Sequence, residues 1–426
     1  MSSVKPSVRT SCRVCGFKKL SPILSLGDLH VSDFVDGSEE VAPKHPLELV
    51  LCNEQAGGCG LLQLKHTVPH EAMYRNYWYR SGMNKTMTAE LHGIASTMEK
   101  IAVVKAGDTV IDIGANDGTL LRGYGVTGIT RVGFEPAKNL MQYNREGGLE
   151  IINDFFNFAA WKKKYGVKAK AKAITAIAMF YDLEDPNAFV SDVKKCLDKD
   201  GVFVVQMSYL PLMLSENAFD NICHEHLEYY SLLSLEHLFN RNGMEIFDVV
   251  LNEINGGSFR VYARHAKGGK NISIPVGAQI RLESLRLYEK SLGLGKRAVY
   301  MAFAERIKEI GVKISAFIKK ELKKGKKVHV YGASTKGNTL LQFYGLDSRH
   351  IAAAAERNPD KWGKKTVGTL IPIISEEQAR KEKPDYFLVL PWHFLPEFKV
   401  REAAYLKAGG KFIVPLPEFK VVGHES

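Results

Sequence analysis

Short apolar runs alternate with periodic, partly polar segments through much of the chain. The first clear run, 109–113, ends at Gly114 and is followed by a helical segment that begins at Thr119. Further runs of this kind occupy 131–135, 151–155, 173–178, 201–205, 327–331, 351–355 and 386–390. Buried strands separated by helical segments are typical of parallel βαβ sheets. The pattern therefore predicts two α/β units, one in the middle of the chain and one at its end.

The same pattern divides the chain into four parts. Residues 1–75 contain short apolar segments between turns, and residues 76–265 contain the first α/β unit. Residues 266–320 show helical periodicity with many charges and are expected to form connecting helices, and residues 321–426 form the second α/β unit. Ligands bind parallel sheets at the carboxyl ends of the strands, so the loops there are the first candidates for function.

Composition narrows the class of protein. The 426 residues are 45% hydrophobic and 25% charged, as in a globular protein. No apolar run approaches the roughly 20 residues of a membrane helix, so we expect a cytoplasmic protein with no membrane partner. The net charge of +11 suits an anionic partner, although lysine runs such as 162–164 are typical of solvated surfaces. No nucleic-acid-binding signature accompanies these runs, which disfavours nucleic acid as that partner.

Four of the six cysteines lie within the first sixty residues. Cys12 and Cys15 form a C-x2-C pair before a glycine, and Cys52 and Cys59 form a C-x6-C pair around Gly57-Gly58. Four thiolates suit a closed tetrahedral Zn²⁺ site, in which the metal would be structural. Four ordinary reduced cysteines are the alternative.

The loop after the first strand of the middle unit has the spacing of a nucleotide-binding turn. It reads Asp112-Ile-Gly-Ala-Asn-Asp-Gly118, which is G-x-x-x-G and not the G-x-G-x-x-G of dinucleotide sites. An acid at Asp112 would repel a pyrophosphate but suits the ammonium group of S-adenosylmethionine. Glu135 ends the next strand and can accept both ribose hydroxyls, and Asp154-Phe155 can contact adenine. The cofactor candidates are Asp112, Gly114, Asn116, Asp117, Gly118, Glu135, Pro136, Asp154 and Phe155.

A dense polar cluster occupies 221–230 and includes His224, Glu225 and His226. Metalloprotease-type sites place two histidines four positions apart on one helical face, whereas here they are two apart. This spacing favours acid–base chemistry over metal binding, because histidine titrates near neutral pH. A structural histidine is the alternative for each ring.

Together these features resemble the sugar C-methyltransferase family, which includes deoxysugar 3-C-methyltransferases. The resemblance covers nearly the whole chain. It rests on the four cysteines, the tyrosine-rich segment 77–84, VIDIGANDG (110–118), His224-Glu-His226, GASTKGNT (332–339) and 356–361. It implies a class I methyltransferase Rossmann-like domain between an N-terminal zinc-binding domain and a C-terminal Rossmann-like domain. The chain departs from the family pattern at Cys223 and Tyr181, where the sugar enzymes carry tyrosine and histidine.

The resemblance also implies a reaction and its residues. The expected substrate is a nucleotide-diphosphate-linked keto-deoxysugar, the methyl donor is S-adenosylmethionine, and the zinc is structural. The catalytic candidates are His226, Glu225, Tyr79 and His224. The substrate-binding candidates are Arg80, Ser81, Asn84, Tyr229, Gly332, Ser334, Lys336 and Asn338. We expect a monomer or homodimer.

The expected chemistry is removal of a proton beside a ketone, followed by attack of the enolate on the methyl group. His226 would be the base, Glu225 would orient it, and Tyr79 or Tyr229 would donate to the oxyanion. Lys336 and the glycine-rich loop suit a diphosphate. Two alternatives are an O- or N-methyltransferase on a sugar nucleotide or natural product, and a non-catalytic protein that binds sugar nucleotides or nucleic acid.

Overall fold

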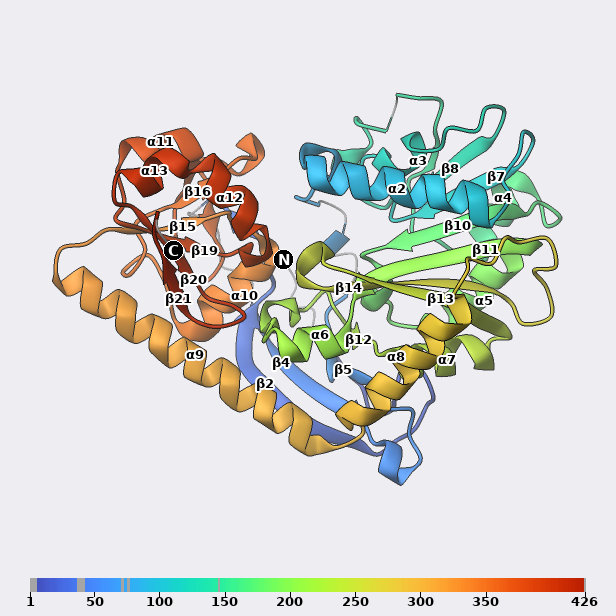
Figure 1. Cartoon of the computed structure of the whole chain (residues 1–426), viewed down its shortest axis with the longest axis horizontal. Coiled ribbons are helices and arrows are strands. Elements are labelled where there is room, and N and C mark those ends of the chain that lie inside the picture. The colour runs from blue at the N-terminus through green and yellow to red at the C-terminus, as the bar shows by residue number, and fades with distance from the viewer. Residues whose placement is uncertain (1–5, 37–42, 70–72, 75–76, 145, 425–426) are drawn as a thin grey trace.

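A computed structural model describes residues 6–36, 43–69, 73–74, 77–144 and 146–424 of the chain (Figure 1). The expected boundary at residues 75/76 lies outside these ranges, and the four predicted domain limits stay predictions. Two α/β units stand side by side, and strands from the N-terminal part of the chain lie beneath and between them (Figure 1).

The middle unit is built on a seven-stranded sheet in the order β13-β14-β11-β10-β7-β8-β9. Neighbouring strands from β11 to β9 pair in parallel, whereas β14 is antiparallel to both of its neighbours. The strands are β7 (Thr109–Ile113), β8 (Thr130–Phe134), β9 (Glu150–Ile152), β10 (Ala171–Ile177), β11 (Leu197–Ser208), β13 (Met244–Asn252) and β14 (Ser258–His265). The apolar runs predicted all five parallel strands.

Helices cover the faces of this sheet, and local sequence explains where several of them begin. Asn84 caps α2 by accepting from Thr86 N and Met87 N, and Asp185 caps α5 next to a proline in the first turn. The helices are α2 (Lys85–Ile101), α3 (Thr119–Arg122), α4 (Phe158–Tyr165), α5 (Pro186–Cys196), α6 (Leu210–Ser215), α7 (Leu232–Arg241) and α8 (Ala278–Leu292).

The N-terminal strands form an antiparallel sheet in the order β12-β5-β4-β2. Its members are β2 (Leu20–His30), β4 (Lys44–Cys52), β5 (Leu62–Leu64) and β12 (Glu228–Tyr229), and β1 (Ser7–Val8) pairs separately with β6 (His66–Thr67). Because β12 belongs to the polar 221–230 cluster, the N-terminal sheet holds that cluster in place from one side.

The C-terminal unit has a six-stranded sheet in the order β18-β16-β15-β19-β20-β21, in which only β21 is antiparallel to its neighbour. The strands are β15 (Val328–Tyr331), β16 (Ala354–Glu356), β18 (Ile373–Ser375), β19 (Tyr386–Val389), β20 (Lys411–Val414) and β21 (Lys420–Val422). The helices are α10 (Thr335–Tyr344), α11 (Glu376–Lys381), α12 (Leu395–Arg401) and α13 (Ala403–Lys407). Two short strands, β3 (Phe34–Val35) and β17 (Lys365–Thr366), tie this unit to the N-terminal part.

The long helix α9 (Arg297–Lys323) runs from the end of α8 along the N-terminal sheet to the C-terminal unit (Figure 1). Its buried side chains, such as Ile307 and Ile314, join Leu47 and Leu49 of β4 and Leu388 of β19 in one hydrophobic cluster. The N-terminal sheet and the C-terminal unit therefore share a core, whereas the sheet of the middle unit packs into two other clusters. Among the described residues no helix, α9 included, is both long and apolar enough to cross a bilayer.

Candidate active site

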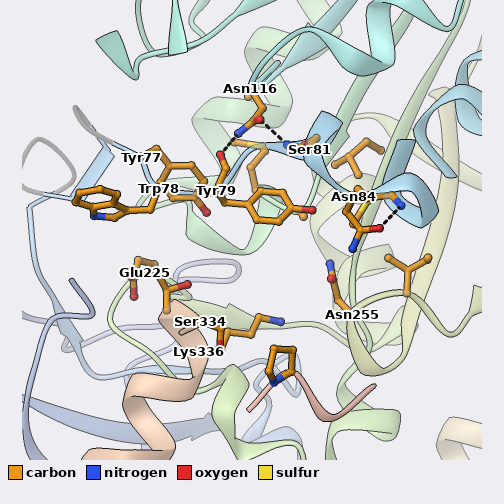
Figure 2. A pocket seen from close by; sticks show the side chains of 18 of the residues that line it. Tyr77, Trp78, Tyr79, Ser81, Asn84, Asn116, Glu225, Asn255, Ser334 and Lys336 are labelled. Carbon is orange, nitrogen blue, oxygen red and sulfur yellow. Dashed lines mark hydrogen bonds between the residues drawn. The ribbon is translucent and has the colours of Figure 1, made fainter. Parts of the chain in front are cut away.

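A cavity of about 470 Å³ lies where the carboxyl ends of the two parallel sheets approach each other. Loops that follow β7, β8 and β10 line one side, and loops that follow β15, β16 and β19 line the other. Figure 2 shows candidates from both units pointing into the same space. The sequence candidates that line it are Tyr79, Ser81, Asn84, Asp112, Gly114, Asn116, Glu135, Pro136, Phe155, Glu225, His226, Gly332, Ser334 and Lys336.

Other candidates among the described residues lie outside this lining and hold the surrounding structure. His224 turns toward the N-terminal sheet, with its Nε2 3.1 Å from the carbonyl oxygen of His45. Asn338 donates to the carbonyl of Asp33 at 3.1 Å, and Tyr229 is buried in β12. These three residues connect the units and do not face the cavity.

The remaining candidates that do not line the cavity lie around the cofactor loop. Asp117 accepts from the Gly82 amide at 2.8 Å, and Gly118 begins α3 with a φ of 80°. The Arg80 guanidinium lies 3.5 Å from the centre of the Tyr143 ring. Asp154 is exposed after β9 and caps its own neighbour's amide at 2.9 Å. Asp117, Gly118 and Arg80 therefore shape the loop, and Asp154 stands beside the cavity.

The middle-unit side of the cavity suits a cation-bearing nucleoside. Gly114 has a φ of 71°, and a Cβ there would lie 3.2 Å from the Met179 side chain, so glycine keeps the turn open. The Glu135 carboxylate accepts from the Asn116 and Ala137 amides at 2.8 and 2.7 Å. Each carboxylate oxygen retains a lone pair for a ribose hydroxyl.

Two acids on this side are buried and have no cationic partner among the residues that the structure describes. Burial raises the pKa of Asp112 to about 7, although Thr175 donates a hydrogen bond to it at 2.6 Å. Burial also raises the pKa of Glu135 to about 7. A buried carboxylate is costly unless a charge or several donors compensate it, so the ammonium group of S-adenosylmethionine fits beside Asp112.

The tyrosine-rich segment before α2 lies over the cofactor loop. The Asn116 side chain donates to the Tyr79 carbonyl and accepts from the Ser81 amide, each at 3.0 Å (Figure 2). These bonds carry the Tyr79 ring into the cavity between the two units (Figure 2). The cofactor loop and the tyrosine-rich segment are therefore connected by hydrogen bonds between the Asn116 side chain and main-chain groups.

His226 is held in one tautomer by Asn221, which was not among the candidate site residues predicted from the sequence. Its Nδ1 lies 2.7 Å from the carbonyl oxygen of Asn221, which can only accept, so Nδ1 carries the proton and Nε2 is the basic nitrogen. The ring packs 4.2 Å from the ring of Tyr181. Burial, followed by the charge of Lys336, lowers its pKa to about 3, which keeps the imidazole neutral.

Glu225 does not take the position expected of it. Its Oε2 is buried without a hydrogen-bond partner among the described residues, and the bond to His226 comes from the backbone of Asn221 instead. Burial raises the pKa of Glu225. No hydrogen bond joins the Glu225 side chain to His226 among the described residues, so its carboxyl group is left to meet a ligand in the cavity.

Lys336 comes from the C-terminal unit and contacts Asn221, the residue that also fixes His226. Its Nζ lies 2.6 Å from Oδ1 of Asn221, and Ser208 also donates to that oxygen at 3.3 Å. Asn221 thus contacts both the base and the cation. Its place in the polar 221–230 cluster was the available signal, but a contact across 115 positions of sequence has no local pattern.

In the C-terminal unit, the loop after β15 leads into the N-terminus of α10, and an acid near it is paired with a lysine. Ser334 caps α10 by accepting from Gly337 N at 3.0 Å. Glu356, at the end of β16, lies 3.3 Å from Lys361 Nζ, and that ammonium also donates to the Ala333 carbonyl at 2.9 Å. His393 completes this wall of the cavity.

The four N-terminal cysteines meet in space. The sulfurs of Cys12 and Cys59 are 3.6 Å apart, those of Cys15 and Cys52 are 3.5 Å apart, and all four lie within 4.8 Å of one another. Disulfides require about 2.05 Å, whereas a tetrahedron with Zn–S bonds of about 2.3 Å has edges of about 3.8 Å. The cluster therefore fits Zn²⁺, which would be structural because all four positions are protein sulfur.

Comparisons with known proteins cover the same three regions. Residues 12–74 match the family described as "Putative zinc binding domain", residues 79–249 match "Methyltransferase domain", and residues 253–417 match "C-methyltransferase C-terminal domain". C-methyltransferase NovU of Streptomyces niveus is 31% identical over 418 residues, which are 97% of each chain. The chain belongs to the C-methyltransferase family.

As a family member, the chain is an S-adenosylmethionine-dependent methyltransferase with a class I Rossmann-like fold and a zinc-binding N-terminal region. The resemblance seen in the sequence is thereby confirmed. Solved structures similar to part of the methyltransferase include CcbJ from Streptomyces caelestis (13% identity, 45% of this chain and 100% of that one, TM-score 0.34). Another is magnesium protoporphyrin IX methyltransferase ChlM from Synechocystis PCC 6803 with bound SAH (12% identity, 42% and 87%, TM-score 0.33).

Proposed function

We propose that this methyltransferase transfers a methyl group to the carbon beside the carbonyl of a nucleotide-diphosphate-linked keto-deoxysugar, through an enolate. The proposal extends the C-methyltransferase activity of the family to a substrate class. Carbon is not nucleophilic in such a sugar until a neighbouring proton is removed, so the site must contain a positioned base.

The observation that carries the proposal is the state of His226. Its Nδ1–H donates to the Asn221 carbonyl, which leaves a lone pair on Nε2 in a ring that lines the cavity. The lowered pKa keeps this ring unprotonated in the ligand-free protein. An anionic substrate would offset the charge of Lys336 and raise the basicity of Nε2 when it binds.

The residues divide the reaction as follows. His226 Nε2 takes the proton, the C–H electron pair becomes the new C=C bond, and the carbonyl π pair moves to oxygen. S-adenosylmethionine, when bound, supplies an electrophilic methyl group. Asp112 and Glu135 hold its ammonium and ribose groups, and Gly114 lets its chain pass close to the backbone. The Tyr79 segment, fixed through Asn116, places its ring in the cavity between the cofactor loop and the substrate side.

The nucleotide part of the substrate binds to the C-terminal unit in this proposal. The loop from Gly332 to Ser334 and the first turn of α10 present backbone N–H groups at a helix N-terminus, which suits a diphosphate. The carboxyl group of Glu225, which lines the same cavity, contacts the sugar. The basic net charge of +11 favours such an anionic ligand.

The test is incubation with labelled S-adenosylmethionine and a panel of nucleotide-linked 4-keto-sugars, read by mass spectrometry. We expect a product heavier by one methyl group whose label stays on carbon through hydrolysis. His226→Ala should lower turnover by about 10²–10⁴-fold with cofactor affinity retained. The matched control is His237→Ala, an exposed position on α7. Label on oxygen or nitrogen, or full activity of His226→Ala, would overturn the proposal.

A further inference from the structure

Lys336 occupies an unusual place for a residue of a phosphate-binding loop. Its side chain leaves the first turn of α10 and extends into the cavity toward the middle unit (Figure 2). The ammonium group reaches Oδ1 of Asn221 at 2.6 Å, a residue of the other unit. It therefore lies beside the candidate base and not over the amide groups of its own helix.

Asn221 holds the two groups through different atoms. Its main-chain oxygen is 2.7 Å from Nδ1 of His226, and its side-chain oxygen is 2.6 Å from Nζ of Lys336. Asn221 is buried and its side-chain NH₂ donates to the Ala218 carbonyl at 3.1 Å, which holds the side chain and sets the separation of these two oxygens. The ammonium group and the imidazole are thereby set in register at the junction of the two units.

We propose that Lys336 is a catalytic residue that stabilises the negative charge on the enolate oxygen, and that Asn221 positions it relative to His226. This inference rests on the proposed function. As His226 removes the proton, the carbonyl π pair moves onto oxygen, and the ammonium group meets that charge without giving up its proton. When the new C–C bond forms, the pair returns to the C=O bond and the sulfonium sulfur keeps the C–S pair.

The arrangement suits this role because the charge is already in place before the reaction. Donors fixed at the position where an oxyanion develops contribute about 10²–10³-fold to the rate. Burial lowers the pKa of Lys336, and the nearby acids Asp220 and Asp182 act against that shift and favour the charged form. A lysine that served only to bind diphosphate would need neither these neighbours nor the bond to Asn221.

The experiment measures exchange of the sugar's α-proton with deuterium from solvent in the absence of methyl transfer. Wild-type protein, saturated with S-adenosylhomocysteine, is incubated in D₂O with the nucleotide-linked 4-keto-sugar that it methylates. Lys336→Met should slow the exchange about 100-fold or more, while the affinity for a nucleoside diphosphate without sugar changes less than about threefold. Lys407→Met, an exposed lysine of α13, is the matched control and should exchange at the wild-type rate.

Two further variants keep the test decisive if Lys336→Met folds poorly. Lys336→Ala supplemented with ethylammonium should recover part of the exchange, because a free cation can enter the vacated space. Asn221→Ser keeps the main-chain carbonyl but loses Oδ1, and it should lower kcat with KM unchanged. Binding of S-adenosylhomocysteine verifies the fold of each variant.

The outcomes separate the two proposals. No exchange by the wild-type protein would overturn the enolate function itself. Exchange by wild type and equal exchange by Lys336→Met, with weakened diphosphate affinity, would leave that function standing and make Lys336 a phosphate ligand. Slow exchange with intact diphosphate affinity supports the oxyanion role.

Discussion

The two α/β units share one arrangement of strand, glycine turn and glutamate, but the side chains around it carry opposite charge in the two units. Each has a strand that ends in a glycine turn, Gly114 after β7 and Gly332 after β15, and each has a glutamate at or just after the end of the next strand. In the middle unit Glu135 faces the cavity with only amide donors, and in the C-terminal unit Glu356 is paired with Lys361.

This difference shows that topology alone does not select a ligand. The middle loop adds the buried acid Asp112, which favours a ligand that carries a positive charge. The C-terminal loop adds Lys336 and compensates its acid, which favours a ligand that carries a negative charge. In the proposed reaction the same sheet edge therefore serves two substrates, and each unit can be tested against the other.

The largest expected effect comes from the zinc site, which packs on only one unit. Cys12, Cys52 and Cys59 belong to the hydrophobic cluster of the middle unit, together with Phe180 and Tyr230. Structural zinc contributes on the order of 10 kcal/mol of apparent binding free energy, so Cys52→Ser should lower the free energy of unfolding by several kcal/mol. Hydrogen exchange should rise first in the middle unit.

Cys196→Ser is the matched control for the zinc variant, because Cys196 is a buried thiol of the same cluster outside the four-cysteine site. It should lower the free energy of unfolding by only about 1–2 kcal/mol. An equal loss in both variants, or equal loosening of the C-terminal unit, would contradict a zinc site that supports the middle unit.

The next effect concerns the acid that distinguishes the middle unit. Asp112→Asn removes the charge that faces the cofactor's ammonium group, and hydrogen bonds to charged groups contribute about 1.5–3 kcal/mol. Affinity for S-adenosylmethionine, measured by calorimetry, should fall about 10–100-fold. Affinity for a nucleoside diphosphate, which binds the other unit, should stay unchanged, and a fall in both would point to a folding defect.

The pH dependence of binding should differ between the units. The pKa values of Asp112 and Glu135 are raised to about 7, so both groups bind protons below that pH in the ligand-free protein. Binding a cation favours the ionised form, and affinity for S-adenosylmethionine should therefore rise with pH, up to about tenfold per unit below pH 7, and level off above it. Nucleoside diphosphate binding should lack this rise, and a flat cofactor profile would contradict the raised pKa values.

The smallest expected effect is on the free energy of unfolding, when the charge of Glu135 or the lysine beside Glu356 is removed. Lys361→Met leaves Glu356 uncompensated in a largely buried place and should lower the free energy of unfolding by about 1–3 kcal/mol. Glu135→Gln removes a buried charge whose raised pKa already costs stability above pH 7, so at pH 8 it should leave the free energy of unfolding unchanged or raise it. Thermal unfolding of the ligand-free protein checks both, and a reversed order would contradict the difference between the acids.

The sequence predicted eight strands of the two units, β7–β11, β15, β16 and β19, because each of these apolar runs is long enough to mark a buried strand between polar turns. The strands β13, β14, β18, β20 and β21 were not among the predicted runs. The zinc cysteines and the loop at Gly114 were also readable, since their spacing is set by local geometry. The two-residue strand β12 was not predicted, because pairing with β5 depends on a partner more than 150 positions away.

The sequence could not predict the orientation of the base, His226, for a different reason. The group that fixes His226 is a main-chain carbonyl, and every residue type has one. Glu225, the neighbouring acid, was the plausible orienting group by type, yet its side chain is buried apart from the ring. His224 is the same residue type as the base, but its ring faces His45 and not the cavity.

The core shared by the N-terminal sheet and the C-terminal unit sets an order of events during protein synthesis. The apolar face of β2 and β4, which includes Leu24, Leu47 and Leu49, is completed by Ile307 and Ile314 of α9. About 250 residues separate β4 from α9, which at 5–20 residues per second is roughly 12–50 s of translation. The first sheet to leave the ribosome is therefore fully covered only at the end, whereas the sheet of the middle unit, which packs into other clusters, is free to fold in the interval.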